Sequence, residues 1–199
     1  MNVLKLKLTG TAPLLMHSDL LANPINPKTR AHKALTDKRK KTEDDHLMIA
    51  RSEFEKSLYT HNGKIVMPTI NLRASFIDGA KLNRLGASFQ RGTLILEEFV
   101  PLDYSGPKTA DKLFDNPAFV DCRSVVISGR RLMRYRPRFS DWAITVDVLY
   151  DDSAIDREDV LRSAQNAGQF CGLGDFRPTK KGPFGRYKVE VIEEIEAAA

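Results

Sequence analysis

The sequence predicts an α+β fold with an antiparallel sheet, in a single domain that covers residues 1–199. Residues 3–8 and 142–150 alternate in polarity with the period of a strand that buries one face. Residues 69–83 and 156–171 carry apolar side chains at helical spacing instead. With insertions set aside, the expected order is strand, helix, strand, strand, helix, strand. This order is the βαββαβ signature of a ferredoxin-like, RRM-like fold, and a looser α+β domain is the alternative.

A large insertion, residues 17–60, follows the first strand and is expected to be partly basic and partly helical. Residues 28–41 contain seven lysines or arginines against one aspartate, so this stretch supplies no buried core. Helical periodicity returns at residues 43–59, where Thr42 and Asp45 resemble a capping box. We therefore expect a helix over residues 43–59.

The middle of the chain is expected to combine a core helix with short strands. A turn signal at Asn62-Gly63 precedes a short strand or extended lead-in at residues 64–67. The core helix 69–83 begins after a proline and buries one apolar stripe. Residues 93–100 are expected to form a strand. Residues 103–121 contain glycine and prolines, so we expect a second insertion that is irregular or partly helical.

The last third of the chain is expected to complete the sheet. An extended region begins at residues 125–127 and runs into residues 130–139, ahead of the long alternating strand. Asp156 is expected to cap the second core helix, which ends at Gly172. Residues 187–192 are expected to form the terminal strand, after which the chain trails off.

The composition excludes several classes of protein. The formal net charge is +5, and the two cysteines, Cys122 and Cys171, have no CxxC or Cys/His spacing, so neither a zinc site nor a disulfide scaffold is indicated. No apolar run approaches the ~20 residues that span a bilayer, and residues 1–5 do not resemble a signal peptide. We expect a cytoplasmic protein that contacts no membrane and carries no cofactor or metal ion.

The arginines of residues 130–138 are the first of three basic clusters. The period of a strand places the even-numbered arginines on one face and Met133, Tyr135 and Phe139 on the other. Guanidinium groups bind phosphates in bidentate geometry and stack on bases, which favours a nucleic-acid ligand. The alternative is an edge strand whose charges prevent aggregation. The candidate residues are Arg130, Arg134, Arg136 and Arg138.

The second basic cluster is the segment 28–41. Charge blocks of this kind are often flexible arms that clasp nucleic acid, and a plain solvated insertion is the alternative. The candidate residues are Lys28, Arg30, Lys33, Lys38, Arg39, Lys40 and Lys41.

The third basic cluster is a glycine-rich stretch near the C-terminus, residues 172–190, which holds four glycines. Glycines let a backbone bend and approach another molecule closely, because no Cβ intervenes. A loop of this kind lined with cations suits a chain of phosphates, and the alternative is a connector with adventitious charge. The candidate residues are Gly172, Gly174, Arg177, Lys180, Lys181, Gly182, Gly185 and Arg186.

The sequence gives a weaker case for an enzyme. The four histidines are scattered without metal-ligand spacing, and no P-loop, nucleophile elbow or paired-carboxylate motif is evident. His17 and Asp19 follow the first strand directly, where a general base or a metal-binding carboxylate could cleave an RNA that lies along the basic surface. These two residues are the candidates if the protein is an endoribonuclease.

Two short stretches are similar to motifs of a known family. Met67–Ala74 looks like the Pro-x-x-x-Leu-Arg-Ala start of the first core helix in the RAMP superfamily of CRISPR-associated proteins. Gly172–Asp175 and Gly182–Tyr187 resemble the glycine-rich loop between the last helix and the last strand of that superfamily. The motifs occur in the expected order and cover about a fifth of the chain.

The resemblance implies a ferredoxin-like domain that binds single-stranded RNA, of the backbone-subunit type that polymerises along guide RNA. Such subunits carry a large insertion after strand one, which matches residues 17–60. The resemblance places Arg73 near the helix start, and the four glycines and Arg186 in an RNA-facing loop. Some of these subunits cleave target RNA with an aspartate after strand one, for which Asp19 is the counterpart. A solitary phage or mobile-element relative would bind single-stranded DNA or have another role.

The three clusters together exceed the whole net charge, so the rest of the surface is acidic on balance. This segregation is typical of nucleic-acid binders. The leading hypothesis is a non-catalytic protein that binds single-stranded RNA or DNA and assembles along the strand, with itself and with other effector-complex subunits. The alternatives are an endoribonuclease, and a structural or assembly protein of a phage or mobile element whose basic patches meet acidic partners.

Overall fold

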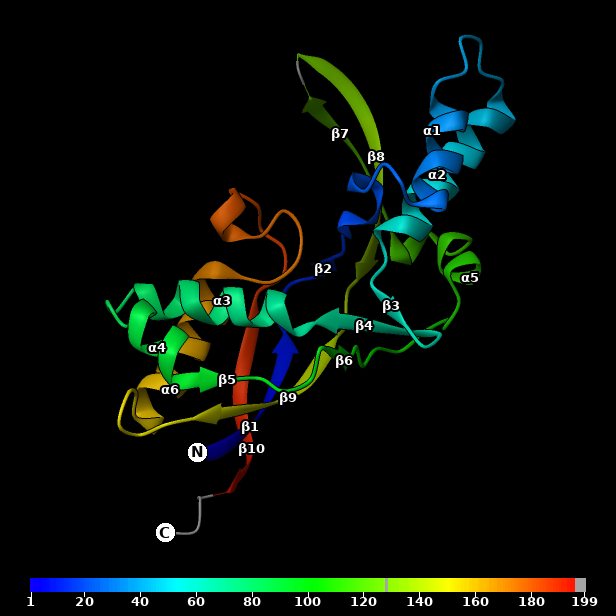
Figure 1. Cartoon of the computed structure of the whole chain (residues 1–199). Coiled ribbons are helices and arrows are strands. Elements are labelled where there is room, and N and C mark those ends of the chain that lie inside the picture. Colours follow the sequence, from blue (N-terminus) through cyan, green and yellow to red (C-terminus); the bar gives the residue numbers. More distant parts are fainter. Residues whose placement is uncertain (128, 196–199) are drawn as a thin grey trace. The chain divides into compact units, whose positions relative to one another are not determined.

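The computed structural model describes residues 1–127 and 129–195, and the chain divides into two compact units (Figure 1). The first unit comprises Met1–Leu14, His61–Ser105 and Ser140–Ala199. The second unit comprises Leu15–Thr60 and Gly106–Phe139. Both units contain helices and antiparallel strands, which confirms the mixed α+β class. The description as a single domain stays a prediction.

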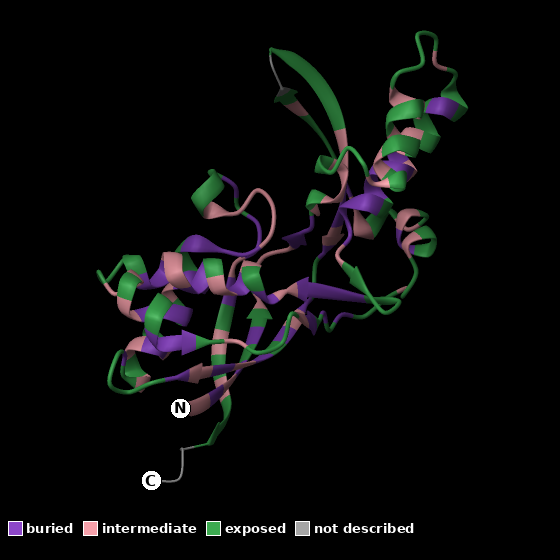
Figure 2. Ribbon diagram, viewed as in Figure 1, coloured by how far each residue is buried: buried purple, intermediate pink, exposed green. Residues whose placement is uncertain are grey.

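The main sheet of the first unit has the strand order β10-β1-β9-β5, and each neighbouring pair is antiparallel (Figure 1). Alternate residues of β1 and β9 are buried, as their sequence pattern predicts (Figure 2). Leu4, Leu6 and Leu8 of β1 are fully buried in the core. The strands are β1 (Asn2–Gly10), β5 (Thr93–Leu94), β9 (Ala143–Tyr150) and β10 (Tyr187–Ile195).

Two core helices pack tightly against each other in this unit, α3 (Thr69–Lys81) and α6 (Arg157–Asn166). The close approach depends on Gly79, because a Cβ there would lie 2.2 Å from the carbonyl oxygen of Ser163. The apolar stripe expected on α3 is fully buried, which confirms this helix and its inner face.

The second core helix begins and ends where the sequence predicts. The side chain of Asp156 accepts a hydrogen bond from the N–H of Asp159 at 2.8 Å and so caps α6. A π-helical turn, η3 (Ala167–Cys171), extends the helix to Gly172, whose φ of 73° ends it. A shorter helix, α4 (Gly86–Gly92), follows α3 in the chain.

The strand expected over residues 93–100 is wrong, because the segment divides between two sheets. β5 pairs with β9, whereas β6 pairs with β4 in a separate sheet of order β3-β4-β6. Between β5 and β6, the carbonyl oxygen of Glu98 accepts hydrogen bonds from the N–H and Oγ1 of Thr69, at 3.0 and 3.1 Å. The backbone there bonds to the start of α3. The strands are β3 (Thr60–His61), β4 (Lys64–Pro68) and β6 (Phe99–Pro101).

The second unit combines helices with a β-hairpin. The capping box at the start of α2 is confirmed, since Thr42 and Asp45 exchange side-chain-to-backbone hydrogen bonds of 3.2 and 3.1 Å. β8 lies between β2 (Leu14–Leu15) and β7 in the sheet order β2-β8-β7. The other elements are η1 (Asp19–Ala22), α1 (Pro27–Thr36), α2 (Glu43–Ser57), α5 (Ala110–Phe114), η2 (Pro117–Phe119), β7 (Val120–Ile127) and β8 (Arg130–Phe139).

Two expectations for the second unit are corrected in part. Residues 125–127 and 130–139 are extended as expected, but the extended region begins earlier, at Val120, and folds into the antiparallel β7–β8 hairpin. The basic segment 28–41, expected as a flexible arm, is largely helical. Its helix α1 is capped by Asn26, whose side chain accepts a hydrogen bond from the N–H of Lys28 at 2.9 Å.

The terminal strand β10 is longer than predicted and continues to Ile195. The extra residues pair with the start of β1, where Lys5 lies opposite Glu193 and forms an ion pair with it. Residues 196–199, where the chain was also expected to trail off, lie outside the described residues. None of the helices formed by the described residues is long and apolar enough to cross a membrane.

Candidate nucleic-acid interface

The glycine-rich loop between η3 and β10 folds back on itself. The N–H of Leu173 donates to the carbonyl oxygen of Gly185 at 2.9 Å. The N–H of Gly185 in turn donates to the carbonyl oxygen of Pro13 at 2.8 Å. A Cβ on Gly182 would lie 1.7 Å from the oxygen of Phe176, and one on Gly185 would lie 1.8 Å from that of Leu173. These two glycines make room for the loop's own backbone. The expectation that they also bring the loop close to another molecule stays a prediction.

The first two glycines of the loop adopt backbone conformations that favour glycine. Gly172 and Gly174 have φ angles of 73° and 77°. Gly172 is buried, and its carbonyl oxygen accepts a hydrogen bond from Oγ of Ser75 at 2.9 Å. Arg177 donates from Nη1 to the carbonyl oxygen of Gly174 at 3.0 Å, so this arginine also stabilises the loop.

Two lysines of the same loop project into solvent. Lys180 and Lys181 are exposed at the end of a short turn, η4 (Pro178–Lys180). Within the described ranges, neither ammonium has a carboxylate partner. Arg186 is half-buried and donates from Nη1 to the carbonyl oxygen of Gln169. The loop therefore offers two unpaired cations on a backbone that is fixed by its own contacts.

Arg73 lies near the start of α3, where the sequence motif places it. It is half-buried, and its Nη2 donates to the carbonyl oxygen of Gln90 at 2.7 Å. This bond ties α3 to the end of α4, so part of the guanidinium already has a structural role.

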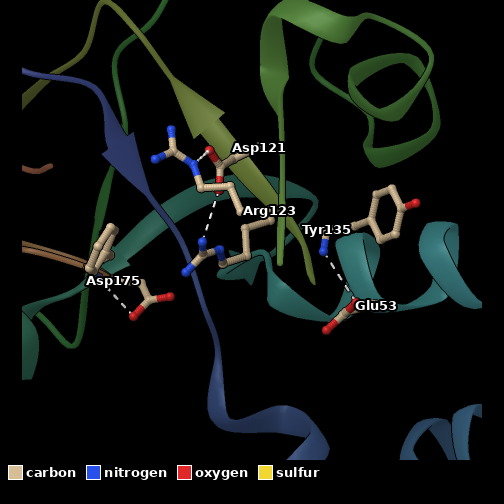
Figure 3. A network of polar contacts seen from close by, with 7 residues as sticks. Glu53, Asp121, Arg123, Tyr135 and Asp175 are labelled. Atoms are coloured by element: carbon tan, nitrogen blue, oxygen red, sulfur yellow. Dashed lines mark hydrogen bonds and ion pairs between the residues drawn. The ribbon is translucent and has the colours of Figure 1, made fainter. Parts of the chain in front are cut away.

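Arg136 is buried in β8, so the prediction of a solvent-facing arginine ladder is wrong at this position. Its Nη2 lies 3.0 Å from Oδ2 of Asp121, which is itself 4% exposed. Nε of Arg123 lies 2.5 Å from the other oxygen of the same carboxylate (Figure 3). Asp121 stands directly opposite Arg136 across the hairpin. The arginine is buried because the neighbouring strand supplies a carboxylate.

Arg134 is also paired. Its Nη1 lies 2.5 Å from Oε1 of Glu53, a buried residue of α2. The N–H of Tyr135 donates to the other oxygen of Glu53 at 3.3 Å (Figure 3). These contacts attach α2 to β8. Arg138, nearer the end of β8, is half-buried.

The available cations of the hairpin lie next to its turn. Arg130 and Arg131 are both exposed, and the described residues offer neither a carboxylate partner. Leu132 and Met133 beside them are 47% and 51% exposed. Both faces of β8 are therefore open here, which is why Arg131 was missed by a prediction based on one face.

The basic segment 28–41 divides into paired and unpaired cations. Lys38 forms an ion pair of 2.6 Å with Asp45, which lowers the pKa of that carboxyl group. Lys28 lies 4.0 Å from Glu55, and Lys41 donates to the carbonyl oxygen of Lys38 at 2.7 Å. Arg30 lies on α1 and is exposed. Four exposed cations of the segment have no carboxylate partner among the described residues, namely Arg30, Lys33, Arg39 and Lys40.

A polar network connects α1 to α2. Nδ1 of His32 lies 3.0 Å from Oγ of Ser52, and Nζ of Lys56 donates to the same oxygen at 2.6 Å. Burial lowers the pKa of Lys56. Burial also lowers the pKa of His32, and the charge of Lys56 adds to this shift. The network holds the basic helix α1 in place.

His17 and Asp19, the candidates for an endoribonuclease, are both exposed around the start of η1. The backbone carbonyl oxygen of His17 accepts a hydrogen bond from the hydroxyl of Tyr59 at 3.1 Å. In the part of the chain that the structure describes, no group of three or more His, Cys, Asp or Glu side chains gathers into a possible metal site. The endoribonuclease stays a hypothesis.

The outer face of the main sheet carries mixed charges. Lys5 lies opposite Asp147 on one side and Glu193 on the other, and Lys7 lies opposite Glu190. The hydrogen bond from Lys5 to Glu193 raises the pKa of the lysine. Lysines that alternate with carboxylates do not form a continuous positive surface for phosphates. The glycine-rich loop is therefore the better candidate surface of this unit.

No protein-family model matches this chain. A search of curated proteins found no match either. The resemblance to the RAMP superfamily therefore stays a prediction.

Sequence reasoning missed three polar residues beside the glycine-rich loop. Gln165, Gln169 and Lys188 line the same hollow as Arg186. The signal that could have found them is spacing, because the glutamines lie one helical turn apart and Lys188 lies two residues after Arg186.

Proposed function

We propose that this chain binds single-stranded nucleic acid, with RNA as the favoured ligand, and that copies assemble along the strand without cleaving it. One observation carries the proposal: each of the three basic clusters keeps exposed cations that lack a carboxylate partner among the described residues. These cations are Arg30, Lys33, Arg39, Lys40, Arg130, Arg131, Lys180, Lys181 and Lys188.

Unpaired cations support binding to phosphates for an energetic reason. A lysine or arginine that already faces a carboxylate must lose that contact before it neutralises a phosphate. An unpaired cation only displaces water, and the phosphate releases condensed counterions when it binds. Arg134 and Arg136 are therefore left out of the proposed surface, since Glu53 and Asp121 hold them.

We also propose that the first unit is a ferredoxin-like domain of the RAMP type. The support is its connectivity. Along the chain, α3 comes after β1 and before β5, and in the sheet β9 lies between these two strands. Likewise α6 comes after β9 and before β10, and in the sheet β1 lies between those two strands. Two interleaved units of this kind are typical of split βαβ folds. The glycine-rich loop also follows the second core helix. The cytoplasmic location and association with other effector-complex subunits belong to the same proposal.

The proposal is tested by purifying the chain at low salt, identifying any nucleic acid that co-purifies, and titrating labelled single strands of RNA and DNA. We expect RNA to bind more tightly, and the logarithm of affinity to fall linearly with the logarithm of salt concentration. The Lys180→Ala/Lys181→Ala variant should bind more weakly. Its salt slope should be lower by about 0.7 for each phosphate contact that is lost.

The matched control is Lys7→Ala/Lys64→Ala, which removes the same charge from exposed lysines of β1 and β4. We expect this control to retain the affinity and most of the slope of the wild type. Equal losses in the two variants would mean that net charge and not the loop determines binding. Failure of the wild type to bind any strand at low salt would contradict the proposed function.

A further inference from the structure

A hollow of about 650 Å³ lies beside β10, at the point where the glycine-rich loop enters the strand. This volume is within the range of about 300–1,000 Å³ found for pockets that hold small molecules. The polar residues that line it all belong to the first unit, and they are Thr11, Gln165, Gln169, Arg186, Lys188 and Glu190.

Backbone contacts fix the walls of this hollow. β10 is the outer strand of the sheet, and η3 lies close to it because Gly168 has no side chain: a Cβ there would lie 2.2 Å from the carbonyl oxygen of Tyr187. The N–H of Thr11 donates to the carbonyl oxygen of Arg186 at 2.8 Å, and the Arg186 guanidinium donates to the carbonyl oxygen of Gln169. The pocket is therefore formed before any ligand arrives.

The two glutamines of the pocket are unengaged. Gln165 and Gln169 lie one turn apart, and across residues 1–127 and 129–195 no hydrogen bond is made by either side-chain amide. Each amide presents a donor beside an acceptor. Adenine carries the complementary donor–acceptor pair on both its Watson–Crick and its Hoogsteen edge, whereas guanine, cytosine and uracil carry such a pair on one edge only. Two free amides therefore match adenine.

The charged residues of the pocket are ordered along the chain. Arg186, Lys188 and Glu190 alternate with Tyr187 and Val189, so they lie on the same side of an extended backbone. The two cations at one end attract a phosphate, and the carboxylate at the other end repels it. This order gives a bound nucleotide one preferred direction.

We propose that this hollow binds one nucleotide of the bound strand, with an adenine base held by Gln165 and Gln169 and a phosphate held by Arg186 and Lys188. The inference rests on the proposed function, because the nucleotide belongs to the strand. The alternative ligand for the same hollow is an extended peptide that pairs with the edge of β10. The unengaged amides and the two cations favour a nucleotide, since backbone pairing by a peptide uses neither.

The test compares the binding of labelled oligo(A), oligo(U) and oligo(C), each of about 12 nucleotides, to the wild type and to Gln165→Ala/Gln169→Ala. We expect the wild type to prefer oligo(A) about tenfold, as one good amide–base pair provides. The double variant should lose this preference and keep its affinity for oligo(U). The control Gln90→Ala alters the chain's third glutamine, which is exposed on α4, and should keep the preference.

The outcomes separate this inference from the function on which it rests. Equal wild-type affinities for the three strands, or a preference that survives in the double variant, would overturn the pocket and leave strand binding intact. A β10 edge that serves a peptide would give the first of these results. Binding of no strand would overturn the proposed function itself. Competition of AMP with oligo(A), absent from the double variant, would support the same pocket with a free nucleotide as ligand.

Discussion

At the scale of single residues, the glycine-rich loop depends on the absence of a side chain at Gly185 as well as on the φ angle of this residue. Gly185 and Gly63 have nearly the same φ, 71° and 73°, but a Cβ on Gly185 would lie 1.8 Å from the oxygen of Leu173, whereas one on Gly63 would meet nothing within 4 Å. We expect Gly63→Ala to lower the free energy of unfolding by about 1 kcal/mol, the cost of a left-handed alanine. Gly185→Ala should lower it by about 3–5 kcal/mol, because the backbone clash is added.

Urea unfolding of the two variants measures this difference. Gly63 is the control, since it shares the φ angle and has open space around it. If both substitutions cost the same, the loop does not fold back on itself as described. A loop that has lost this packing would also place Lys180 and Lys181 differently, so Gly185→Ala should weaken strand binding even where the protein remains folded.

At the scale of elements, the attachment of α1 to α2 should depend on pH. His32 contacts Ser52 beside Lys56. Burial and the charge of Lys56 lower the pKa of His32 from the ordinary value of 6.5. The charge of Arg134 also lowers this pKa, whereas the charge of Glu53 raises it. A folded pKa below the unfolded one means that the unfolded chain takes up the proton first. The contribution of His32 to stability is therefore fully present above pH 6.5, and it is lost as the pH drops from 6.5 through the folded pKa.

The measurement is the free energy of unfolding of the wild type and of His32→Asn at about pH 7.5 and about pH 5.5. The asparagine can still reach Ser52 and does not titrate, so the loss of stability between the two pH values should be smaller in the variant. His46→Asn, which alters an exposed histidine of α2, is the control and should keep the wild-type dependence. An unchanged dependence in His32→Asn would assign the effect to other groups.

Local signals in the sequence predicted single elements well and long-range pairing poorly. The capping box of Thr42 and the period-2 pattern of β9 act within a few residues, so the sequence is sufficient to locate them. The exposure of Arg136 depends on Asp121, which reaches it only through the β7–β8 register. The division of residues 93–100 likewise depends on a partner in α3. Periodicity assigns a residue to a face but does not identify what that face meets.

At the scale of the whole molecule, the positive charge favours assembly on a strand over assembly without one. Each copy has a formal net charge of +5, so copies repel one another weakly in solution. The unpaired cations lie in both units, so each unit by itself offers positive charge that a strand can neutralise. A single strand supplies the negative charge that lets neighbouring copies approach.

We therefore expect the number of bound copies to rise in steps as the strand is lengthened, with a constant number of nucleotides for each copy. Native mass spectrometry on strands of increasing length measures the steps, and nuclease digestion of the complexes should give protected fragments with the same spacing. The Lys180→Ala/Lys181→Ala variant should need longer strands or lower salt to reach the same occupancy, because fewer phosphates are neutralised by each copy. One copy per strand at every length would contradict side-by-side assembly. Oligomers that form without nucleic acid and ignore salt would instead favour a structural protein whose contacts are made between copies, since phosphate neutralisation would then contribute nothing to its assembly.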